Sequence, residues 1–514
     1  MSKPYVFESV LNQPDRVPNK ISQCTWKKDA DRSTTVHSVV DWNAPRPKIL
    51  PDSLAAVGHT PLIRLNRIPQ SLGLECEVVV KCEFLNPGGS VKDRMALRIL
   101  DDAEKAGVLK PGYTVIEPSS GNTGIGLAMA CAIRGYRCII VIAEKISYEK
   151  EYVMRALGTE VVRTPGTANS FSRDGMFGTV HRLKNEIPNS VILDQFSNPS
   201  NPLTHYDTTA EEIYHQCDGK VDMIVMGAGT GGSITGLGRK FKEISPQTKI
   251  VCSDPYGSVY GYPDSINKTD VTFWEIEGMG YEFLPTCLDR EVIDHWEKVL
   301  DKDSLPMARR LIKEEGLLIG ASCGAILVGA LRAAQKMNLG KGHRVVVILP
   351  DSIRNYLTKF VCDQWMEQRG LQEAVNTGNH KWWDTNVLKL QLPQLQTASP
   401  NTPCEQVLSL MRKSGVVQVP VVDDRGHTTG VVTIQNLTNK LISGEVKPSD
   451  GAGNCIDRVY PKAVTSANLG LISRILEKDP YVLVIESNGV GAAKVNKPIG
   501  VVTGIDLLSF TQKN

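Results

Sequence analysis

A lysine placed directly after a glycine-rich bend is the first candidate for chemistry in this chain. Lys92 stands in the segment 86–94, which reads NPGGSVKDR, where a helical pattern begins. A lysine at such a place can project into a cleft, where desolvation and the positive end of a helix dipole lower its pKa toward that of a nucleophilic amine. Taken alone, Lys92 is weak support for a catalytic site, because a lysine beside Asp93 and Arg94 more often lies on the solvated surface.

Three further segments combine glycines with small hydroxyls. Residues 117–124 (EPSSGNTG) precede an apolar helix, so they form either an anion cradle or an ordinary helix N-cap. Residues 227–233 (GAGTGGS) lack the Lys-Ser/Thr of a Walker loop and the G-x-G-x-x-G spacing of a dinucleotide site, and a phosphate cradle is favoured there over a turn. In residues 320–324 (GASCG), Ser322 either meets a heteroaromatic nitrogen or caps a helix.

Short β-rich runs alternate with helical patterns from Pro51 to about Phe360. This alternation predicts right-handed crossovers and an α/β fold with a doubly wound, mainly parallel sheet. Ligands in such folds bind at the carboxyl ends of the strands, so the junctions between strands and loops matter most. The expected strands are Glu77–Lys81, Thr114–Glu117, Cys138–Ala143, Met223–Met226, Ile250–Ser253 and Val345–Leu349, with helical stretches such as Gly124–Arg134 and Gly324–Lys336.

The composition of the chain argues against several classes of protein. With 58 Lys and Arg against 56 Asp and Glu, no basic field points to nucleic acid or membrane, and the apolar runs fall far short of the ~18 residues of a spanning helix. The N-terminus has acids and no apolar core, so no targeting segment is expected. The 12 cysteines include no C-x-x-C pair and suit reduced, buried thiols, which predicts a cytoplasmic enzyme.

The last part of the chain contains an internal repeat. Gly430–Thr433 and Gly500–Thr503 both read GVVT, and a β run precedes each copy. Units this short cannot each bury a face alone, so the two copies should pack together as one module.

Taken together, the lysine, the phosphate cradle, the carboxylate cradle and the lone hydroxyl resemble the tryptophan-synthase-β-like (fold type II) pyridoxal-phosphate enzymes. Within these, GGSVKDR, SGNTG and EGMGY (residues 277–281) are most similar to the eukaryotic cystathionine β-synthases. The resemblance implies a core of two subdomains with doubly wound, mainly parallel sheets, followed by a tandem-repeat α/β Bateman module. The predicted parts are an irregular N-terminal arm (1–45), a catalytic core (46–370), a linker (371–384) and the Bateman module with its two repeats (385–514).

The family's site residues carry over to matching positions. The resemblance implies that Lys92 forms the Schiff base with pyridoxal 5′-phosphate (PLP), that Asn122 bonds the 3′-oxygen of its ring, and that Ser322 bonds its pyridine nitrogen. A serine there, rather than an aspartate, leaves the nitrogen unprotonated and favours elimination and replacement. The implied phosphate ligands are Gly229, Thr230, Gly231, Gly232 and Ser233, and the implied ligands of the substrate carboxylate are Ser119, Ser120, Asn122, Thr123 and Gln195.

The reaction that the resemblance implies is replacement of the hydroxyl of serine by the thiol of homocysteine, with O-acetylserine as a second donor and hydrogen sulfide as a product from cysteine. Tyr281 would shape the side of the second substrate, and a homodimer is expected. Phe196 departs from the family, which usually has Tyr there. The alternatives are an O-acetylserine sulfhydrylase (cysteine synthase) and, from another class, a non-catalytic sensor of adenosyl ligands.

Two further binding sites, one near each end of the chain, are left unassigned. Cys24 and His37 keep the separation of a haem ligand pair in the family, but the Ser-Pro before the histidine is replaced by Thr-Val, so haem is not assigned and no other metal site is predicted. Thr503 and Asp506 match the ribose site of Bateman modules. Valines near 417 stand where an aromatic platform is expected, which puts S-adenosylmethionine binding in doubt.

Overall fold

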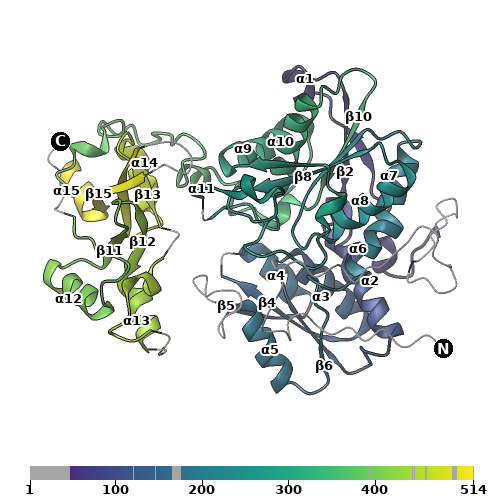
Figure 1. The fold of residues 1–514 in the computed structure, drawn as a ribbon, viewed down its shortest axis with the longest axis horizontal. Coiled ribbons are helices and arrows are strands. Elements are labelled where there is room, and N and C mark those ends of the chain that lie inside the picture. Colours follow the sequence, from purple (N-terminus) through teal and green to yellow (C-terminus); the bar gives the residue numbers. More distant parts are fainter. Residues whose placement is uncertain are drawn as a thin grey trace. The chain divides into compact units, whose positions relative to one another are not determined.

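The computed structural model describes residues 37, 47–119, 121–144, 146–164, 175–271, 273–392, 395–442, 444, 446–457, 460–488 and 495–512. The chain divides into two compact units (Figure 1). The core unit comprises Met1–Asn267 and Trp274–Val361, and the C-terminal unit comprises Lys268–Phe273 and Cys362–Asn514. The C-terminal unit therefore includes the residues predicted as a linker. Among the described residues, no helix combines the length and apolar character needed to cross a bilayer.

The larger sheet of the core unit has six strands in the order β1-β2-β10-β7-β8-β9. Only the pairing of β1 with β2 is antiparallel, and the other neighbours run parallel. The four central strands β2, β10, β7 and β8 are rich in Val and Ile and largely buried, as a parallel sheet covered on both faces requires, whereas the edge strand β1 is mostly exposed. They are β1 (Leu62–Arg64), β2 (Glu77–Cys82), β7 (Met223–Gly227), β8 (Lys249–Pro255), β9 (His295–Val299) and β10 (Arg344–Leu349).

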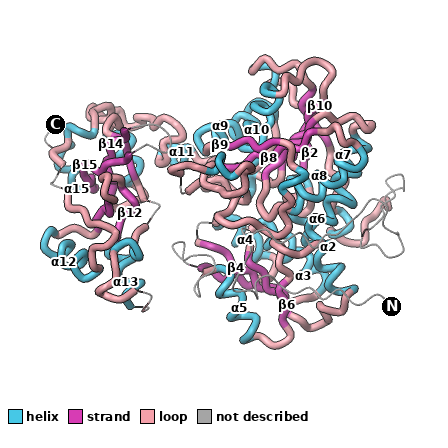
Figure 2. Tube along the Cα trace, viewed as in Figure 1, coloured by secondary structure: helices cyan, strands magenta, loops and turns pink. Residues whose placement is uncertain are grey.

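The smaller sheet of the core unit has four parallel strands in the order β5-β4-β3-β6 (Figure 2). Successive side chains of a strand point to opposite faces, so Ile140 and Ile142 join one apolar cluster while Ile139 and Val141 join another. The first cluster includes residues of α2 and α3, and the second includes residues of α5. The strands are β3 (Thr114–Pro118), β4 (Arg137–Ala143), β5 (Glu160–Thr164) and β6 (Ser190–Ile192).

The helices of the core unit cover these two sheets. In the larger sheet, one face packs against α7 and α8, which contribute Ile213 and Phe241 to the same apolar cluster as Ile224 and Val346. The helices are α1 (Ile68–Ser71), α2 (Lys92–Lys105), α3 (Asn122–Arg134), α4 (Tyr148–Ala156), α5 (Met176–Glu186), α6 (Ser200–Thr204), α7 (Ala210–Gln216), α8 (Gly232–Ile244), α9 (Asp301–Glu315) and α10 (Ala321–Lys336), with a π-helix at His205–Thr209.

The C-terminal unit contains the sequence repeat. The first GVVT lies in β12, which pairs antiparallel with β11, and the second lies in β15, which pairs antiparallel with β14. Each copy has its own apolar cluster, centred on Val419 and Val432 in the first and on Val482 and Val502 in the second. The elements are α11 (Asp363–Glu367), α12 (Cys404–Ser414), β11 (Gln418–Val422), β12 (Thr428–Thr433), α13 (Ile434–Ile442), β13 (Lys462–Val464), α14 (Leu469–Leu476), β14 (Tyr481–Asn488), β15 (Val495–Thr503) and α15 (Gly504–Thr511).

The six expected strands and two expected helices are all present, within a few residues of their predicted ends. Each of the four chemistry-bearing segments also lies at a helix start. Lys92 opens α2, Asn122 opens α3, Gly232 opens α8, and Ser322 is the second residue of α10. The four segments with candidate cofactor residues therefore all lie at helix N-termini, where the helix dipole favours a bound anion.

Candidate active site

One cavity in the core unit brings most of the predicted cofactor residues together. Its walls include Lys92 and Asn122 from the smaller sheet's side, residues of the loop after β7, and Ser322 from α10. Segments that lie more than 200 positions apart in the sequence thus meet at one place. The lining residues are Val91, Lys92, Asn122, Met226, Gly227, Ala228, Gly229, Gly231, Ser233, Ile234, Glu277, Gly278, Met279, Ser322, Ile326, Ile348 and Pro350.

Lys92 is held in this cavity by the loop that was predicted to bind phosphate. Its Nζ donates a hydrogen bond to Oγ1 of Thr230 at 3.3 Å. Burial lowers the pKa of Lys92 to about 8. At pH 7 roughly a tenth of the Lys92 side chains are therefore neutral amines, far more than for an exposed lysine, and this is the form that attacks a carbonyl carbon or accepts a proton.

The loop after β7 is a backbone cradle in which glycines are required at two positions. A Cβ at Gly229 would lie 2.5 Å from the backbone oxygen of Gly278, closer than any real contact of this kind. Gly231 has φ +83°, which is costly for a residue with a side chain, and its Cβ would lie 2.5 Å from that of Leu288. The cradle leads directly into α8, so its N–H groups and the helix dipole both favour a bound anion.

Two buried residues outside the predicted set fix the hydroxyls of this cradle. Asn201 donates from Nδ2 to Oγ1 of Thr230 at 2.8 Å, and a Cβ at Gly232 would collide with the Asn201 side chain. His205 lies with Nε2 2.9 Å from Oγ of Ser233, and burial, together with Arg94 and Lys92, lowers the pKa of this histidine to about 3. The neutral ring supports Ser233 without adding a charge beside the cradle. Neither residue belongs to a glycine-rich segment, so the sequence offered no signal for them.

Among the predicted substrate residues, Asn122 lines the cavity, and Ser119, Thr123 and Gln195 brace the wall around the start of α3. Ser119 is fully buried, and its Oγ accepts from the backbone N–H groups of Gly121 and Gly124, each at 2.9 Å. Thr123 donates to Oε1 of Gln195 at 2.6 Å, and Gln195 donates in turn to the backbone oxygen of Pro118. Ser120 lies outside the described residues. A role of these residues in holding a substrate carboxylate stays a prediction.

Tyr281 belongs to an aromatic cluster beside the cavity. Its ring lies 5.5 Å from that of Phe196 and 5.3 Å from that of Phe283, and Phe177 completes the cluster. Phe196, the departure from the family pattern, therefore replaces a hydroxyl by an apolar edge that packs against Tyr281. The predicted role of Tyr281 toward a second substrate is compatible with this position and stays a prediction.

A carboxylate on the cavity wall, Glu277, is covered by two lysines. Lys150 lies with Nζ 2.5 Å from Oε2 of Glu277, and Lys359 forms an ion pair with Oε1. Although burial opposes ionisation, these ammonium groups hold the pKa of Glu277 below its usual range. Glu277 therefore stays ionised, and the two lysines neutralise its charge. Its carboxylate then does not oppose the attraction of an anion to Lys92 and the cradle.

A buried ion network below the first turn of α2 anchors the helix that carries Lys92. Arg94 is 3% exposed and forms ion pairs with Glu83 and Glu212, both at 2.7 Å, while Lys81 lies 2.6 Å from Glu212. Burial opposes ionisation, yet Arg94 lowers the pKa of Glu83 to about 2. Arg94 belongs to the KDR motif, but from the sequence it was expected only as a surface neighbour of Lys92.

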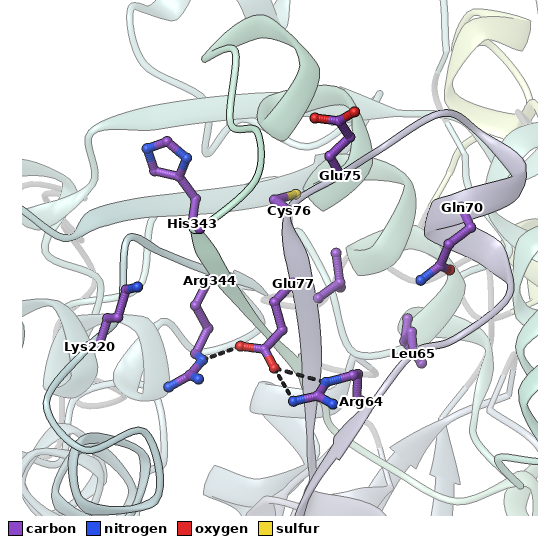
Figure 3. A pocket seen from close by; sticks show the side chains of 11 residues that line it. Arg64, Leu65, Gln70, Glu75, Cys76, Glu77, Lys220, His343 and Arg344 are labelled. Atoms are coloured by element: carbon purple, nitrogen blue, oxygen red, sulfur yellow. Dashed lines mark hydrogen bonds and ion pairs between the residues drawn. The ribbon is translucent and has the colours of Figure 1, made fainter.

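A second pocket lies at the opposite, amino-terminal ends of β2 and β10 and shows no comparable chemistry. Figure 3 shows Glu77 at its centre, shared by the guanidinium groups of Arg64 and Arg344. Because Arg344 and Arg64 bond the Glu77 carboxylate and lower its pKa, this group is poorly suited to accept a proton. The wider lining is Arg64, Leu65, Gln70, Glu75, Cys76, Glu77, Val78, Lys220, Gly342, His343 and Arg344.

The residues considered at the two ends of the chain have structural partners. In the predicted ribose site, Oδ2 of Asp506 accepts from the backbone N–H and the hydroxyl of Thr503, both at 2.7 Å, and this capping box starts α15. His37 lies with Nδ1 2.6 Å from Asp207, and Cys24 lies outside the described residues. Haem binding, which was not assigned from the sequence, and S-adenosylmethionine binding, which the sequence put in doubt, are not tested by these contacts.

Comparison with known proteins agrees with this site. A family model described as "Pyridoxal-phosphate dependent enzyme" matches residues 54–351, and one described as "CBS domain" matches residues 390–443. A cystathionine beta-synthase of Rattus norvegicus is 48% identical over 96% of this chain and 91% of its own length, and one of Apis mellifera is 48% identical over 97% of each chain. The chain belongs to the cystathionine β-synthase family. A more distant member, from Saccharomyces cerevisiae, is 36% identical over 88% of this chain.

Solved structures show the same core fold. A hydrogen sulfide-producing enzyme from Fusobacterium nucleatum has a TM-score of 0.56 and 38% identity, covering 60% of this chain and 100% of its own. An O-acetylserine-dependent cystathionine beta-synthase from Helicobacter pylori has a TM-score of 0.56 and 36% identity, covering 60% of this chain and 98% of its own. The predicted fold class, a fold type II PLP core with a C-terminal Bateman module, is confirmed.

The residues of the cavity fit the PLP that this family uses. The cradle offers backbone N–H groups, the Thr230 and Ser233 hydroxyls and the N-terminus of α8, which suits a phosphate. Lys92 offers an amine with a lowered pKa for the aldehyde, and Asn122 and Ser322 supply polar groups on other walls of the same cavity. The small-molecule, amino-acid substrates of such enzymes fit the same site.

Proposed function

We propose that this chain replaces the hydroxyl of serine by the thiol of homocysteine at the Lys92 cavity, giving cystathionine and water. The observation that carries the proposal is the convergence of Lys92, Asn122, the 227–233 cradle and Ser322 on one cavity. If these segments were only helix N-caps, they would have no reason to meet in one cavity, because an N-cap bonds only the backbone N–H groups of its own helix. Family membership supports the choice of this reaction over other PLP chemistry.

The residues that would hold the cofactor follow from the site. The cradle Gly229, Thr230, Gly231, Gly232 and Ser233 would bind its phosphate, Lys92 its aldehyde carbon, Asn122 its ring oxygen and Ser322 its ring nitrogen. When bound, PLP supplies an electron-withdrawing ring that stabilises negative charge at the α-carbon of an amino acid. Ser322 is neutral and would leave the ring nitrogen unprotonated, a setting that favours loss of the β-hydroxyl over transamination.

Once the amino group of serine has displaced Lys92 from the aldehyde carbon of the cofactor, the freed Nζ would act as the proton carrier of the reaction. This Nζ, neutral in part because burial lowers its pKa to about 8, accepts the α-proton of serine. The same proton passes to the β-hydroxyl, which departs as water. Thr230 accepts a hydrogen bond from Nζ and keeps the amine directed toward the cavity between the two transfers.

The substrate carboxylate would be held at the N-terminus of α3. Ser119, Thr123 and Gln195 are fixed there by the bonds among Ser119, Gly121 and Gly124 and between Thr123 and Gln195. The helix start supplies backbone N–H groups and a favourable dipole for a carboxylate. Ser120 and Asn122 complete the proposed set.

The thiol side of the reaction would be shaped by Tyr281 and its aromatic neighbours. The sulfur of homocysteine would form its bond to the β-carbon once the hydroxyl has left, and the thiol proton would pass through Nζ of Lys92 to the α-carbon. We also propose that O-acetylserine serves as a second donor, because acetate leaves more easily than hydroxide, and that cysteine yields hydrogen sulfide when it replaces serine. The names of the two solved relatives describe these activities for those proteins.

The nature of the nucleophile tests this proposal directly. With serine as donor, the kcat/KM for homocysteine should clearly exceed that for sulfide, with cystathionine identified by mass spectrometry. The reverse ranking, with cysteine as the main product, would assign the chain to O-acetylserine sulfhydrylase chemistry. No turnover with either nucleophile would favour the non-catalytic sensor.

The assembly and location of the enzyme are further parts of the proposal. We infer a homodimer, supported by apolar residues of α15 in the C-terminal unit that are exposed in the single chain, Ile505 (75%) and Leu508 (62%). We infer a cytoplasmic location, supported by 11 free cysteines among the described residues, ten of them buried. The near balance of charges supports the absence of nucleic-acid and membrane partners. Sedimentation velocity and cell fractionation test these statements.

A further inference from the structure

Asp351 stands at the point where three of the cofactor-binding segments meet. It follows β10 by two residues and is fully buried. Its backbone forms an antiparallel bridge with Ser90, two residues before Lys92, and its backbone oxygen accepts from the N–H of Gly320, two residues before Ser322. No motif contains Asp351, and the site as described so far makes no use of it.

The side chain of Asp351 reaches the third segment. Its Oδ2 accepts from Nδ2 of Asn122 at 2.8 Å and from the hydroxyl of Tyr356 at 2.5 Å. On the other side, Nδ2 of Asn355 donates to Oδ1 of Asn122 at 3.0 Å. The amide of Asn122 is therefore held at both ends, with its nitrogen toward a carboxylate and its oxygen toward a donor.

This arrangement fixes what Asn122 can offer to the cavity. The amide nitrogen carries two N–H donors and the amide oxygen two lone pairs, of which Asp351 takes one donor and Asn355 one lone pair. The donor that remains for a ligand is the second N–H of Asn122, which suits an anionic oxygen. If the carboxylate were replaced by a group that can also donate, the amide of Asn122 could turn over and present its oxygen instead.

The space that the Asp351 side chain occupies is left open by a glycine. A Cβ at Gly320 would lie 2.0 Å from Oδ1 of Asp351, so only glycine leaves room for it. Within the described residues, Oδ1 has no hydrogen-bond partner. A fully buried carboxylate with one unbonded oxygen is costly, and its position here is enforced by its backbone bonds to both neighbouring segments.

We propose that Asp351 is a positioning residue, which orients the amide of Asn122 so that an N–H, and not the amide oxygen, faces the ring oxygen of PLP. The inference rests on the proposed function, because it assumes that Asn122 contacts the cofactor ring. Asp351 itself touches neither cofactor nor substrate and acts through Asn122.

The test is a double-mutant cycle on the holoenzyme with two readouts, the visible absorption spectrum of bound PLP and the dissociation constant of PLP. Asp351→Asn should shift the absorption maximum and weaken PLP binding by roughly tenfold, the effect of losing one well-placed hydrogen bond. In the Asn122→Ala background the same substitution should change binding by less than about twofold, because the residue it orients is gone.

Asp254→Asn is the matched control. Asp254 is another buried carboxylate, 1% exposed and paired with Lys298, near the carboxyl end of β8, which β7 separates from β10 in the same sheet. No hydrogen bond joins Asp254 to Asn122. Asp254→Asn should alter the thermal stability of the protein and leave the absorption maximum of bound PLP unchanged. If Asp351→Asn does not fold, Asn355→Ala serves instead, and it should shift the spectrum in the wild-type background and not in Asn122→Ala.

The outcomes separate this inference from the proposed function. The role of Asp351 would be overturned if Asp351→Asn left the absorption spectrum and affinity of PLP unchanged. It would also be overturned if the losses of PLP affinity in Asp351→Asn and Asn122→Ala multiplied in the double variant. Either outcome would leave Asn122 in the site. A wild-type spectrum in Asn122→Ala would overturn the assignment of Asn122 itself, and the inference with it. A spectral shift in Asp254→Asn equal to that in Asp351→Asn would show that the effect is only structural.

Discussion

Gly229 gives the sharpest prediction about the phosphate cradle. In Gly229→Ala the new Cβ would lie 2.5 Å from the backbone oxygen of Gly278, whereas ordinary contacts begin at 3.4 Å. The loop after β7 and the Gly278 loop must therefore separate by about 0.9 Å. They are joined by the bond from the N–H of Gly280 to the oxygen of Ala228, at 2.8 Å, so this separation also displaces the neighbouring N–H groups of the cradle.

The expected size of the effect follows from the hydrogen bonds at risk. Each bond to a charged phosphate contributes ~1.5–3 kcal/mol, so loss of one bond weakens PLP binding by roughly ten- to hundredfold. Titration of apoprotein with PLP, followed by its visible absorption, measures this change. Gly340→Ala is the matched control, since nothing lies within 4 Å of a Cβ there and its φ is unremarkable. Equal affinity of Gly229→Ala and Gly340→Ala for PLP would refute the cradle.

Three further predictions follow from the same contacts. Because burial lowers the pKa of Lys92 to about 8, the rate of covalent PLP incorporation into apoprotein should rise with pH as the amine loses its proton, with its midpoint near pH 8; a midpoint near the usual lysine pKa of about 10.4 would contradict the burial argument. Arg94→Leu leaves Glu83 and Glu212 with Lys81 alone and should lower the free energy of unfolding by ~3–5 kcal/mol in urea titrations. The exposed pair Arg64–Glu77 is its control, and Arg64→Leu should cost ~1 kcal/mol or less. Deleting residues 385–514 should leave an active core. S-adenosylmethionine should change the rate of the full chain by less than about twofold, because Asp506 already caps α15 and Val417 has no aromatic ring on which an adenine could stack. Micromolar binding by calorimetry with several-fold activation would show this wrong.

The parts of the fold that the sequence predicted well are those with a local signal. Runs such as Val345–Leu349 and Met223–Met226 are short, apolar and partly β-branched, which favours a buried strand, and both are strands. Glycine spacing predicted the cradle, because Gly229 and Gly231 occupy positions where backbone approach or a positive φ excludes side chains. The repeated GVVT likewise predicted two similar halves of the C-terminal unit.

The parts that were missed depend on contacts between distant segments. Asp351 and Asn201 lie in no motif, and only the folded chain brings them to Asn122 and Thr230. Arg94 was in view, but its burial depends on Glu83 and Glu212, which arrive from other elements. Ser119 and Gln195 were predicted from the family pattern, and the structure adds that they brace the wall around α3.

The covalent attachment point of the cofactor tests the central claim most directly. Reducing the holoenzyme with borohydride fixes PLP to the lysine that binds it, and mass spectrometry of the peptides locates the modified residue. The geometry predicts a pyridoxyl group on Lys92 alone, and loss of both the label and cystathionine formation in Lys92→Ala, with the fold retained by circular dichroism. A label on another buried lysine, such as Lys150 or Lys298, or near-normal turnover in Lys92→Ala, would contradict the account.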